Sequence, residues 1–310
     1  MNQILFDALQ VRYIKLHITI SFLEDTLLPQ NKVSALRGGM GEMLLKMNCV
    51  RDRDCANCDF EKNCIVQRIM YSKYEIKPVF MTAGESIGYI FECENYQEKF
   101  VTGETLHFQL ILFGKMLVYF NQFVQAFMML GDAGLGREQM RFRIHSVKNE
   151  QNQVILSENK IDLRNYRIRM LSDYVECRMK QISEKELQNR LIFHTPATIK
   201  YQNEYVQDFQ MRPLTEALKR RIYMLDCYEG MESDLREFEP SLPEVLEQEH
   251  IFTVVKRYSN RKDMRMELRG IRGYMQTEVI EEELLELLLA GELIHVGKHT
   301  NFGFGRYTVR

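Results

Sequence analysis

The same order of elements, an apolar helix followed by a glycine-rich loop and a strand, occurs twice in this chain. The second copy closes the sequence, where an apolar run at 284–289 leads into a glycine-rich loop and strand at 297–309. The first copy lies about half a chain earlier, where a helical run at 113–130 leads through the glycines of 131–137 into a basic strand at 141–145. A repeat of this kind predicts two units of similar topology, and 310 residues are enough for two domains of ordinary size.

Hydrophobic periodicity predicts the order β-α-β-β-α-β in the first half. In the strand at 13–22, apolar residues such as Leu16 alternate with polar residues such as His17, which indicates one face against helices and one open polar face. The later elements of this half are predicted as a helix at 32–47, strands at 79–82, 88–93 and 104–112, a helix at 113–130 and a strand at 139–147. This order is that of a ferredoxin-like unit.

The second half repeats the same order. Its predicted elements are a strand at 190–200, a helix at 213–228, strands at 251–259 and 264–276, a helix at 281–290 and a final strand within 293–309, which the glycine-rich loop interrupts. The expected fold class is therefore α+β, with tandem ferredoxin-like (RRM-like) units and a Cys-rich insertion. We expect an N-terminal ferredoxin-like domain at 1–150 with the Cys-rich loop 49–64, connecting strands at 151–187, and a C-terminal ferredoxin-like domain at 188–310.

Four of the seven cysteines are clustered. Cys49, Cys55, Cys58 and Cys64 form the pattern Cys-x5-Cys-x2-Cys-x5-Cys, and four thiolates at such spacing predict a closed, tetrahedral zinc site with a structural role. An iron–sulfur cluster and four free thiols are the alternatives. Because the sequence shows no secretory signal, we expect reduced thiols and a cytoplasmic protein.

Charge is segregated along the chain. The formal net charge is −2, but acidic residues dominate 226–249 and basic residues dominate 256–272. Binding to phosphates depends on the local field, so this pattern is compatible with an RNA-binding face, and a solvated surface with balanced ion pairs is the alternative. The apolar residues of 108–130 recur at helical spacing among polar ones, which favours an amphipathic helix over a membrane span.

The glycine-rich loops are candidate phosphate sites, because glycines let the backbone adopt positive φ and approach a ligand closely. Each loop follows a helix and enters a strand, which is the reverse of the order in dinucleotide-binding motifs, and the sequence contains no Walker loop. We therefore expect polynucleotide phosphates rather than a nucleotide cofactor. The residues predicted to bind RNA are Arg137, Lys298, Gly303, Gly305 and Arg306.

Several motifs are similar to those of one protein family. They are Leu-Arg-Gly-Gly-Met-Gly at 36–41, His-Thr-Pro at 194–196, Gly-Ile-Arg-Gly-Tyr at 270–274 and the loop at 297–305. On these residues the chain resembles the CRISPR-associated precursor-RNA-processing endoribonucleases of the RAMP superfamily. The resemblance implies a protein that binds CRISPR repeat RNA across tandem ferredoxin-like units and cuts it without a metal, so that no cofactor is required for catalysis. Proteins of a CRISPR effector complex are further expected partners, whereas a membrane and DNA are not.

Metal-free cleavage of RNA uses the ribose 2′-hydroxyl as the nucleophile, so the protein must move protons and stabilise charge on the phosphate. Histidine suits proton transfer near neutral pH, and Lys or Arg stabilises the charge. Many members of the family place a His near the first helix, whereas this chain has no His between His17 and His107. The catalytic candidates are His17, Lys32, Arg37 and His299.

Two other functions stay open. A non-catalytic RAMP protein would bind guide RNA as a subunit of an effector complex, and the missing histidine of the first helix favours this hypothesis. A zinc-stabilised interaction module with no RNA role is the third hypothesis, but it leaves both glycine-rich loops unexplained.

Overall fold

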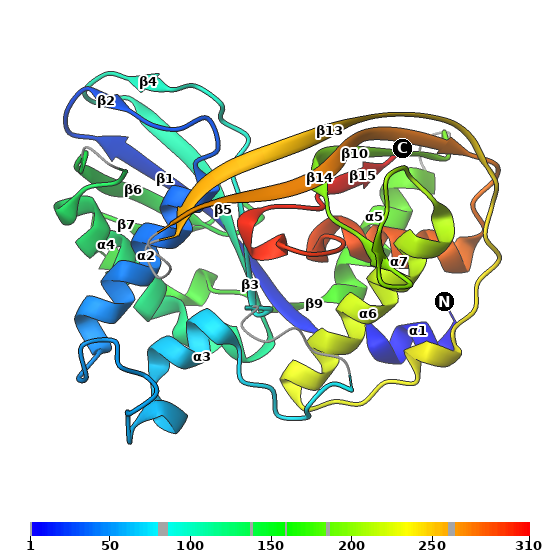
Figure 1. Ribbon diagram of the computed structural model, residues 1–310, viewed down its shortest axis with the longest axis horizontal. Helices are drawn as coiled ribbons and strands as arrows, with labels where there is room; N and C mark the ends of the chain where they lie inside the picture. The colour runs from blue at the N-terminus through cyan, green and yellow to red at the C-terminus, as the bar shows by residue number, and fades with distance from the viewer. Residues whose placement is uncertain (1, 80–85, 137–138, 159, 184–186, 260–263) are drawn as a thin grey trace.

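The computed structural model describes residues 2–79, 86–136, 139–158, 160–183, 187–259 and 264–310, which form the two lobes seen side by side in Figure 1. The first half of the chain forms α1 (Gln3–Ala8), β1 (Arg12–Phe22), β2 (Thr26–Leu27), α2 (Val33–Asn48), α3 (Ile65–Tyr71), β3 (Tyr89–Glu92), β4 (Lys99–Phe100), β5 (Thr105–Phe113), α4 (Phe120–Ala133) and β6 (Phe142–Lys148), with 3₁₀ turns at Glu61–Asn63 and Gly114–Tyr119.

The second half forms β7 (Val154–Ser157), β8 (Lys160–Ile161), β9 (Arg169–Met170), α5 (Leu171–Ser183), β10 (Arg190–Ala197), β11 (Lys200–Tyr201), β12 (Glu204–Tyr205), α6 (Met211–Glu229), β13 (Val245–Ser259), β14 (Met264–Thr277), α7 (Glu282–Ile294) and β15 (Tyr307–Val309). Its 3₁₀ turns lie at Leu163–Asn165, Leu235–Glu237 and Thr300–Phe302.

Strand β1 lies inside the sheet of the first lobe. The strand order is β3-β5-β1-β6-β7-β8, with β9 also paired to β1, so β3, β5, β1 and β6 have the order of a ferredoxin-like unit. Leu16 and Ile18 of β1 are buried and face Phe123 and Phe127 of α4, which also packs against α2. The alternation in the sequence therefore predicted the covered face, and His17 projects from the other one.

The sheet of the second lobe has the same topology, with the order β13-β14-β10-β15. Helix α7 packs against α5, α6 and β15, and every residue from Leu284 to Ile294 is buried, including Glu286 and Glu292. Strands β13 and β14 form a long hairpin, which Figure 1 shows arching from the second lobe over to α2 of the first. This hairpin therefore reaches across the junction between the two lobes.

The tandem ferredoxin-like fold is confirmed, with differences in single elements. The helix predicted at 113–130 begins as a 3₁₀ turn and becomes α-helical only at Phe120. The segment 151–187 contains the helix α5 in addition to the expected strands. Most of the strand predicted at 79–82 lies outside the described residues, and the domain boundaries stay a prediction.

The Cys-rich loop does not form the predicted zinc site. In the described part of the chain, no group of three or more His, Cys, Asp or Glu side chains could hold a metal ion. Cys55 is exposed, whereas Cys64 packs against the core, and the Cys49 thiol accepts a hydrogen bond from the Arg53 N–H at 3.3 Å. Because Cys49, Cys55, Cys58 and Cys64 do not converge, this arrangement fits neither zinc nor an iron–sulfur cluster.

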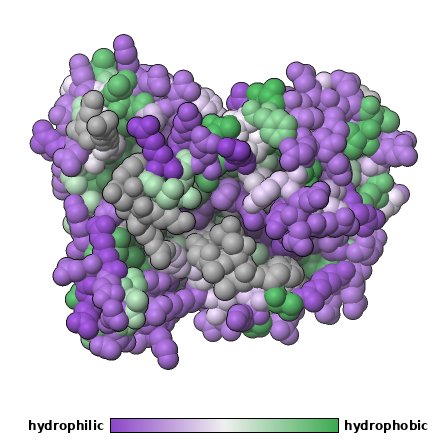
Figure 2. Space-filling view, in the orientation of Figure 1, coloured by the Kyte–Doolittle hydropathy of each residue, from purple (hydrophilic) through white to green (hydrophobic). Residues whose placement is uncertain are grey.

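Hydrophilic residues dominate the face of the molecule shown in Figure 2, where apolar residues form separate patches. The notch between the two lobes at the top of this view is flanked mostly by hydrophilic residues. Among the described residues, no helix combines the length and the apolar character that crossing a membrane requires.

Candidate active site

The glycine-rich loop, residues 297–305, lies against strand β3 of the first lobe. Gly303 has a φ of +77°, and a Cβ atom there would lie 2.8 Å from the carbonyl oxygen of Phe91 on β3. Gly305 has a φ of +72°, and its Cβ would lie 1.9 Å from the carbonyl oxygen of Val296. A side chain at either position would displace the backbone, so Gly303 is needed for the loop to lie against β3, and Gly305 for the loop to close on Val296.

The backbone N–H groups of these glycines are used within the second lobe. Gly303 donates to the carbonyl oxygen of Thr300 at 2.8 Å, and Gly305 donates to that of Pro196 at 2.9 Å. Both glycines are buried. Their amides are thus not available to a phosphate, which corrects the expected role of Gly303 and Gly305: Gly303 lets the loop approach β3, and Gly305 lets the loop fold back onto Val296.

The loop places Phe302 beside two arginines from different lobes. The guanidinium carbons of Arg37 on α2 and of Arg257 on β13 each lie 4.4 Å from the centre of the Phe302 ring. The ring is 8% exposed, so both cation–π contacts are shielded from water. This group exists only where α2, the loop and the hairpin meet.

Both arginines keep an unused hydrogen-bond donor. The Nε atoms of Arg37 and Arg257 are buried and have no hydrogen-bond partner among the described residues. Burial and the charge of Arg37 lower the pKa of Arg257. Buried donors normally have an acceptor, and an oxyanion beside the two guanidinium groups would satisfy both donors and reduce their repulsion. The pair is therefore suited to a phosphate.

His299 and Lys298 belong to the same loop. Burial, and then the charges of Lys298 and Arg257, lower the pKa of His299 to about 4. The imidazole is therefore neutral at neutral pH and can accept a proton. A bound phosphate would offset the nearby positive charges, so it would favour the imidazolium ion that forms when His299 takes up a proton.

Two family models match the chain. The model of the N-terminal domain AF_1859_N matches residues 9–168, more than half of the chain, so the chain belongs to that family. The model of the CRISPR-associated endoribonuclease Cas6 matches residues 191–307. The chain is a Cas6-type protein. No curated protein matches it.

Solved structures of Cas6 proteins share the fold. A chain of a partial Cas6-RT-Cas1–Cas2 complex matches with a TM-score of 0.57 and 12% identity, over 97% of this chain and 46% of that chain. The product complex of a Thermus thermophilus Cas6 matches with a TM-score of 0.52 and 14% identity, over 96% of this chain and 99% of that one. The Cas6-type chain thus spans less than half of the first relative and nearly all of the second. At such identities the likeness shows the fold alone.

Lys32, a predicted catalytic residue, has a structural role instead. Its side chain is 1% exposed. The ammonium group donates to three backbone carbonyl oxygens, those of Pro29, Gln30 and Asn95, at 3.3, 3.4 and 2.9 Å. Burial lowers the pKa of Lys32. Because its three N–H groups hold the backbone that leads into α2, Lys32 has no free donor for a phosphate, which corrects the prediction.

His17 lies apart from the group around Phe302. It projects from the open face of β1, where its Nδ1 is 3.5 Å from the amide nitrogen of Gln109. Burial, and then the charge of Lys15, lower the pKa of His17. Arg37 belongs to α2, which packs with α4 on the opposite side of the sheet. The structure therefore does not bring His17 and Arg37 together.

Arg306 connects the lobes. Its Nε lies 3.4 Å from an oxygen of Glu92 on β3, and it also forms an ion pair with Glu94. It is thus already paired, in contrast to the predicted free phosphate ligand. Arg137 lies outside the described residues. Of the predicted site residues, Lys298 and His299 lie in the same loop as Phe302, and Arg37 contacts the Phe302 ring.

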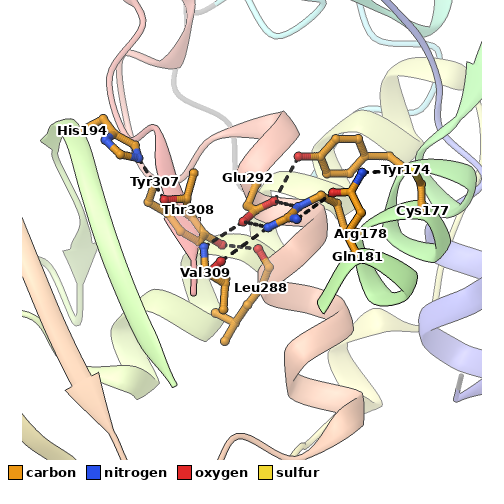
Figure 3. Close-up of polar contacts among 10 residues, drawn as sticks. All are labelled: Tyr174, Cys177, Arg178, Gln181, His194, Leu288, Glu292, Tyr307, Thr308 and Val309. Atoms are coloured by element: carbon orange, nitrogen blue, oxygen red, sulfur yellow. Dashed lines mark hydrogen bonds and ion pairs between the residues drawn. The ribbon is translucent and has the colours of Figure 1, made fainter. Parts of the chain in front are cut away.

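A groove of about 1010 Å³ lies next to Arg306. Figure 3 shows its wall, where the Nε2 of His194 on β10 is 2.9 Å from the Thr308 hydroxyl and Arg178 of α5 donates to Glu292 of α7 at 2.7 Å. Burial, and then the charge of Arg310, lower the pKa of His194. The charged residues that line the groove are Glu94, Arg178, Arg272, Arg306 and Arg310. Cations outnumber acids there, so the groove is a second surface suited to phosphates.

Sequence reasoning did not assign three important residues. The sequence indicates Arg257 only through the basic run at 256–272, and it marks Phe302 as an aromatic residue of the loop without giving it a role. Glu92 was missed, although a single acid at the end of the apolar strand at 89–92 is a usable signal for a buried charge that needs partners.

Proposed function

We propose that this Cas6-type protein is an endoribonuclease that cleaves CRISPR repeat RNA in precursor transcripts by attack of a ribose 2′-hydroxyl. The observation that carries the proposal is the neutral imidazole of His299, close to Lys298 and Arg257, in the loop whose Phe302 ring holds Arg37 and Arg257 at the junction of the lobes. The match to the Cas6 endoribonuclease model supports the reaction class.

His299 is the proposed base. Its neutral imidazole accepts the proton of the 2′-hydroxyl while the 2′-oxygen attacks the adjacent phosphorus. The bond from phosphorus to the 5′-oxygen breaks, which leaves a 2′,3′-cyclic phosphate on one product and a 5′-hydroxyl on the other. The Nε–H groups of Arg37 and Arg257 donate to the non-bridging oxygens, where negative charge grows in the transition state.

Lys298 is the proposed acid. The 5′-oxygen takes up one proton as it leaves, and the ammonium group of Lys298 is the charged donor next to His299 in the loop. The nucleophile belongs to the RNA, so the reaction needs no metal-bound hydroxide and is metal-independent.

The long hairpin and the groove are the proposed binding surfaces for the RNA backbone. Lys256 and Arg265 are exposed on β13 and β14, and Arg272 leads from the hairpin into the groove. Phosphate binding responds to this local field, so the net charge of −2 does not oppose it. The hairpin and the groove thus provide cationic surfaces in addition to the group around Phe302.

A non-catalytic guide-RNA-binding subunit is the second candidate. Helix α2 contains no histidine, and a structurally similar Cas6 chain belongs to a complex with RT, Cas1 and Cas2. In that case the same cationic site would bind RNA without cutting it, and other CRISPR proteins would be the partners.

Incubation of the purified protein with its cognate repeat RNA in EDTA separates these candidates. We expect cleavage at one position with a 2′,3′-cyclic phosphate, identified by mass spectrometry, and no cleavage when that ribose is 2′-deoxy. His17→Ala is the matched control for His299→Ala, because it removes a half-buried histidine away from the site. Tight binding without cleavage would favour the subunit, and absence of both would refute the RNA function.

A further inference from the structure

One buried carboxylate of the first lobe holds both ends of the glycine-rich loop. Glu92, the last residue of β3, is 4% exposed. Its Oε1 lies 2.8 Å from Nε2 of His295, which precedes the loop, and 3.4 Å from Nε of Arg306, which follows the loop. The ammonium group of Lys15 on β1 lies 2.8 Å from Oε2. Three basic side chains from two lobes thus meet on a single acid.

Two hydrogen-bond acceptors from different parts of the chain surround the ring of His295. His295 is fully buried, with Nδ1 2.9 Å from the carbonyl oxygen of Phe304 and Nε2 2.8 Å from Glu92. Burial alone would raise the pKa of Glu92, but Lys15, His295 and Arg306 together hold it well below its usual range, so Glu92 is ionised. A carbonyl and an ionised carboxylate only accept hydrogen bonds, so the ring of His295 is held between two acceptors.

The loop between these two contacts carries the proposed reactive groups. Lys298, His299 and Phe302 all lie between His295 and Arg306 in the chain, whereas Arg37 belongs to the other lobe. The position of the loop on β3 therefore determines where the imidazole lies relative to Arg37. A buried ion pair adds little net stability, because desolvation offsets the attraction, but its geometry is specific.

We propose that Glu92 and His295 are positioning residues for RNA cleavage, which fix the glycine-rich loop relative to Arg37. This inference rests on the proposed function. A displacement of about 1 Å between reacting groups lowers a rate by about 100-fold, so loosening the loop should slow cleavage at saturating RNA. The affinity for RNA should change little, because Glu92 is not one of the residues proposed to bind the RNA backbone on the hairpin and in the groove.

The test compares Glu92→Gln with Glu229→Gln. Glu229 is a second buried carboxylate that joins the lobes, through Arg12 at 2.6 Å, and in the described part of the chain its hydrogen bonds go to Arg12 and not to the loop. Single-turnover cleavage at saturating RNA and the RNA dissociation constant are measured for both variants. We expect Glu92→Gln to slow cleavage by about 100-fold with affinity retained, and Glu229→Gln to keep the rate. Equal rate losses, or a loss of affinity alone in Glu92→Gln, would overturn the proposal.

Amide hydrogen exchange supplies a readout that does not depend on cleavage. We expect faster exchange at 297–305 in Glu92→Gln and in His295→Gln, with exchange in α4 unchanged. Unchanged exchange in the loop would overturn the proposal even if the rate fell. Should Glu92→Gln fail to fold, His295→Gln decides by the same two measurements. A wild-type protein that does not cleave RNA would refute the proposed function, while faster exchange in the variants would still show that Glu92 holds the loop.

Discussion

Replacement of His299 tests the proposed chemistry at its centre. His299→Ala removes the imidazole but leaves Arg37, Arg257 and Lys298, which supply the charge for binding. A positioned general base contributes about 100- to 10,000-fold to a rate, so single-turnover cleavage should fall by a factor in that range. The RNA dissociation constant should stay close to that of the wild type.

The pH dependence follows from the surroundings of His299. Burial, and then Lys298 and Arg257, lower its pKa to about 4, which disfavours the imidazolium ion by roughly 3 kcal/mol relative to an ordinary histidine. The base acts in its neutral form, so kcat/KM should rise with pH through about 4 and be level at neutral pH. In the RNA complex, the bound phosphate offsets the charges of Lys298 and Arg257, so the pKa of His299 should be higher there. The rise of kcat with pH should therefore lie at higher pH than the rise of kcat/KM.

Quenched-flow cleavage of labelled repeat RNA measures both quantities, with His17→Ala as the control. Profiles are recorded for the wild type, for His299→Ala and for the control from acid to neutral pH. An unchanged rate in His299→Ala would refute the assignment of the base. A kcat/KM limb centred near the ordinary histidine value of about 6.5 would refute the electrostatic argument.

Three further outcomes are expected. Arg37→Ala should weaken RNA binding by about 10-fold, because a charge-assisted hydrogen bond to phosphate is lost; filter binding measures this, and unchanged affinity would contradict the phosphate role. Gly305→Ala should lower the free energy of unfolding in urea by at least about 3 kcal/mol, because φ is +72° and the new Cβ would meet the Val296 carbonyl at 1.9 Å. Burial raises the pKa of Asp226 from 3.8 to about 8, so the free energy of unfolding should fall as pH rises between these values, by up to about 1.4 kcal/mol per unit. In Asp226→Asn this decrease should be absent. If urea unfolding gives both proteins the same pH dependence of the free energy of unfolding between these values, the prediction is contradicted.

The elements of the fold follow from patterns that are local in the sequence. Alternation in β1 identified its buried face, and the apolar run at 284–289 identified the helix α7. The start of β13 was placed too late, because Glu247 and Glu249 interrupt its hydrophobic pattern although their backbones pair with β14. An edge strand with polar side chains shows no periodicity that could reveal it.

The contacts between the lobes could not be predicted in this way. Glu92 and His295 are 203 residues apart, and no motif contains either of them. Glycine at 303 and 305 predicts a close approach of the backbone, but it does not tell whether a phosphate or a strand comes close. Lys32 precedes a helix, where a lysine is usually exposed, and its burial depends on the distant carbonyl of Asn95. Long-range geometry decides each of these cases.

The central claim is that α2, the hairpin and the glycine-rich loop together hold the phosphate that is cleaved. A crystal structure with repeat RNA that carries a 2′-deoxy ribose at the cleavage position tests this directly. We predict that the scissile phosphate lies within about 3 Å of the Nε atoms of Arg37 and Arg257, with the 2′ carbon facing His299. A scissile phosphate on the open face of the first sheet beside His17, or in the groove beside His194, would contradict the claim.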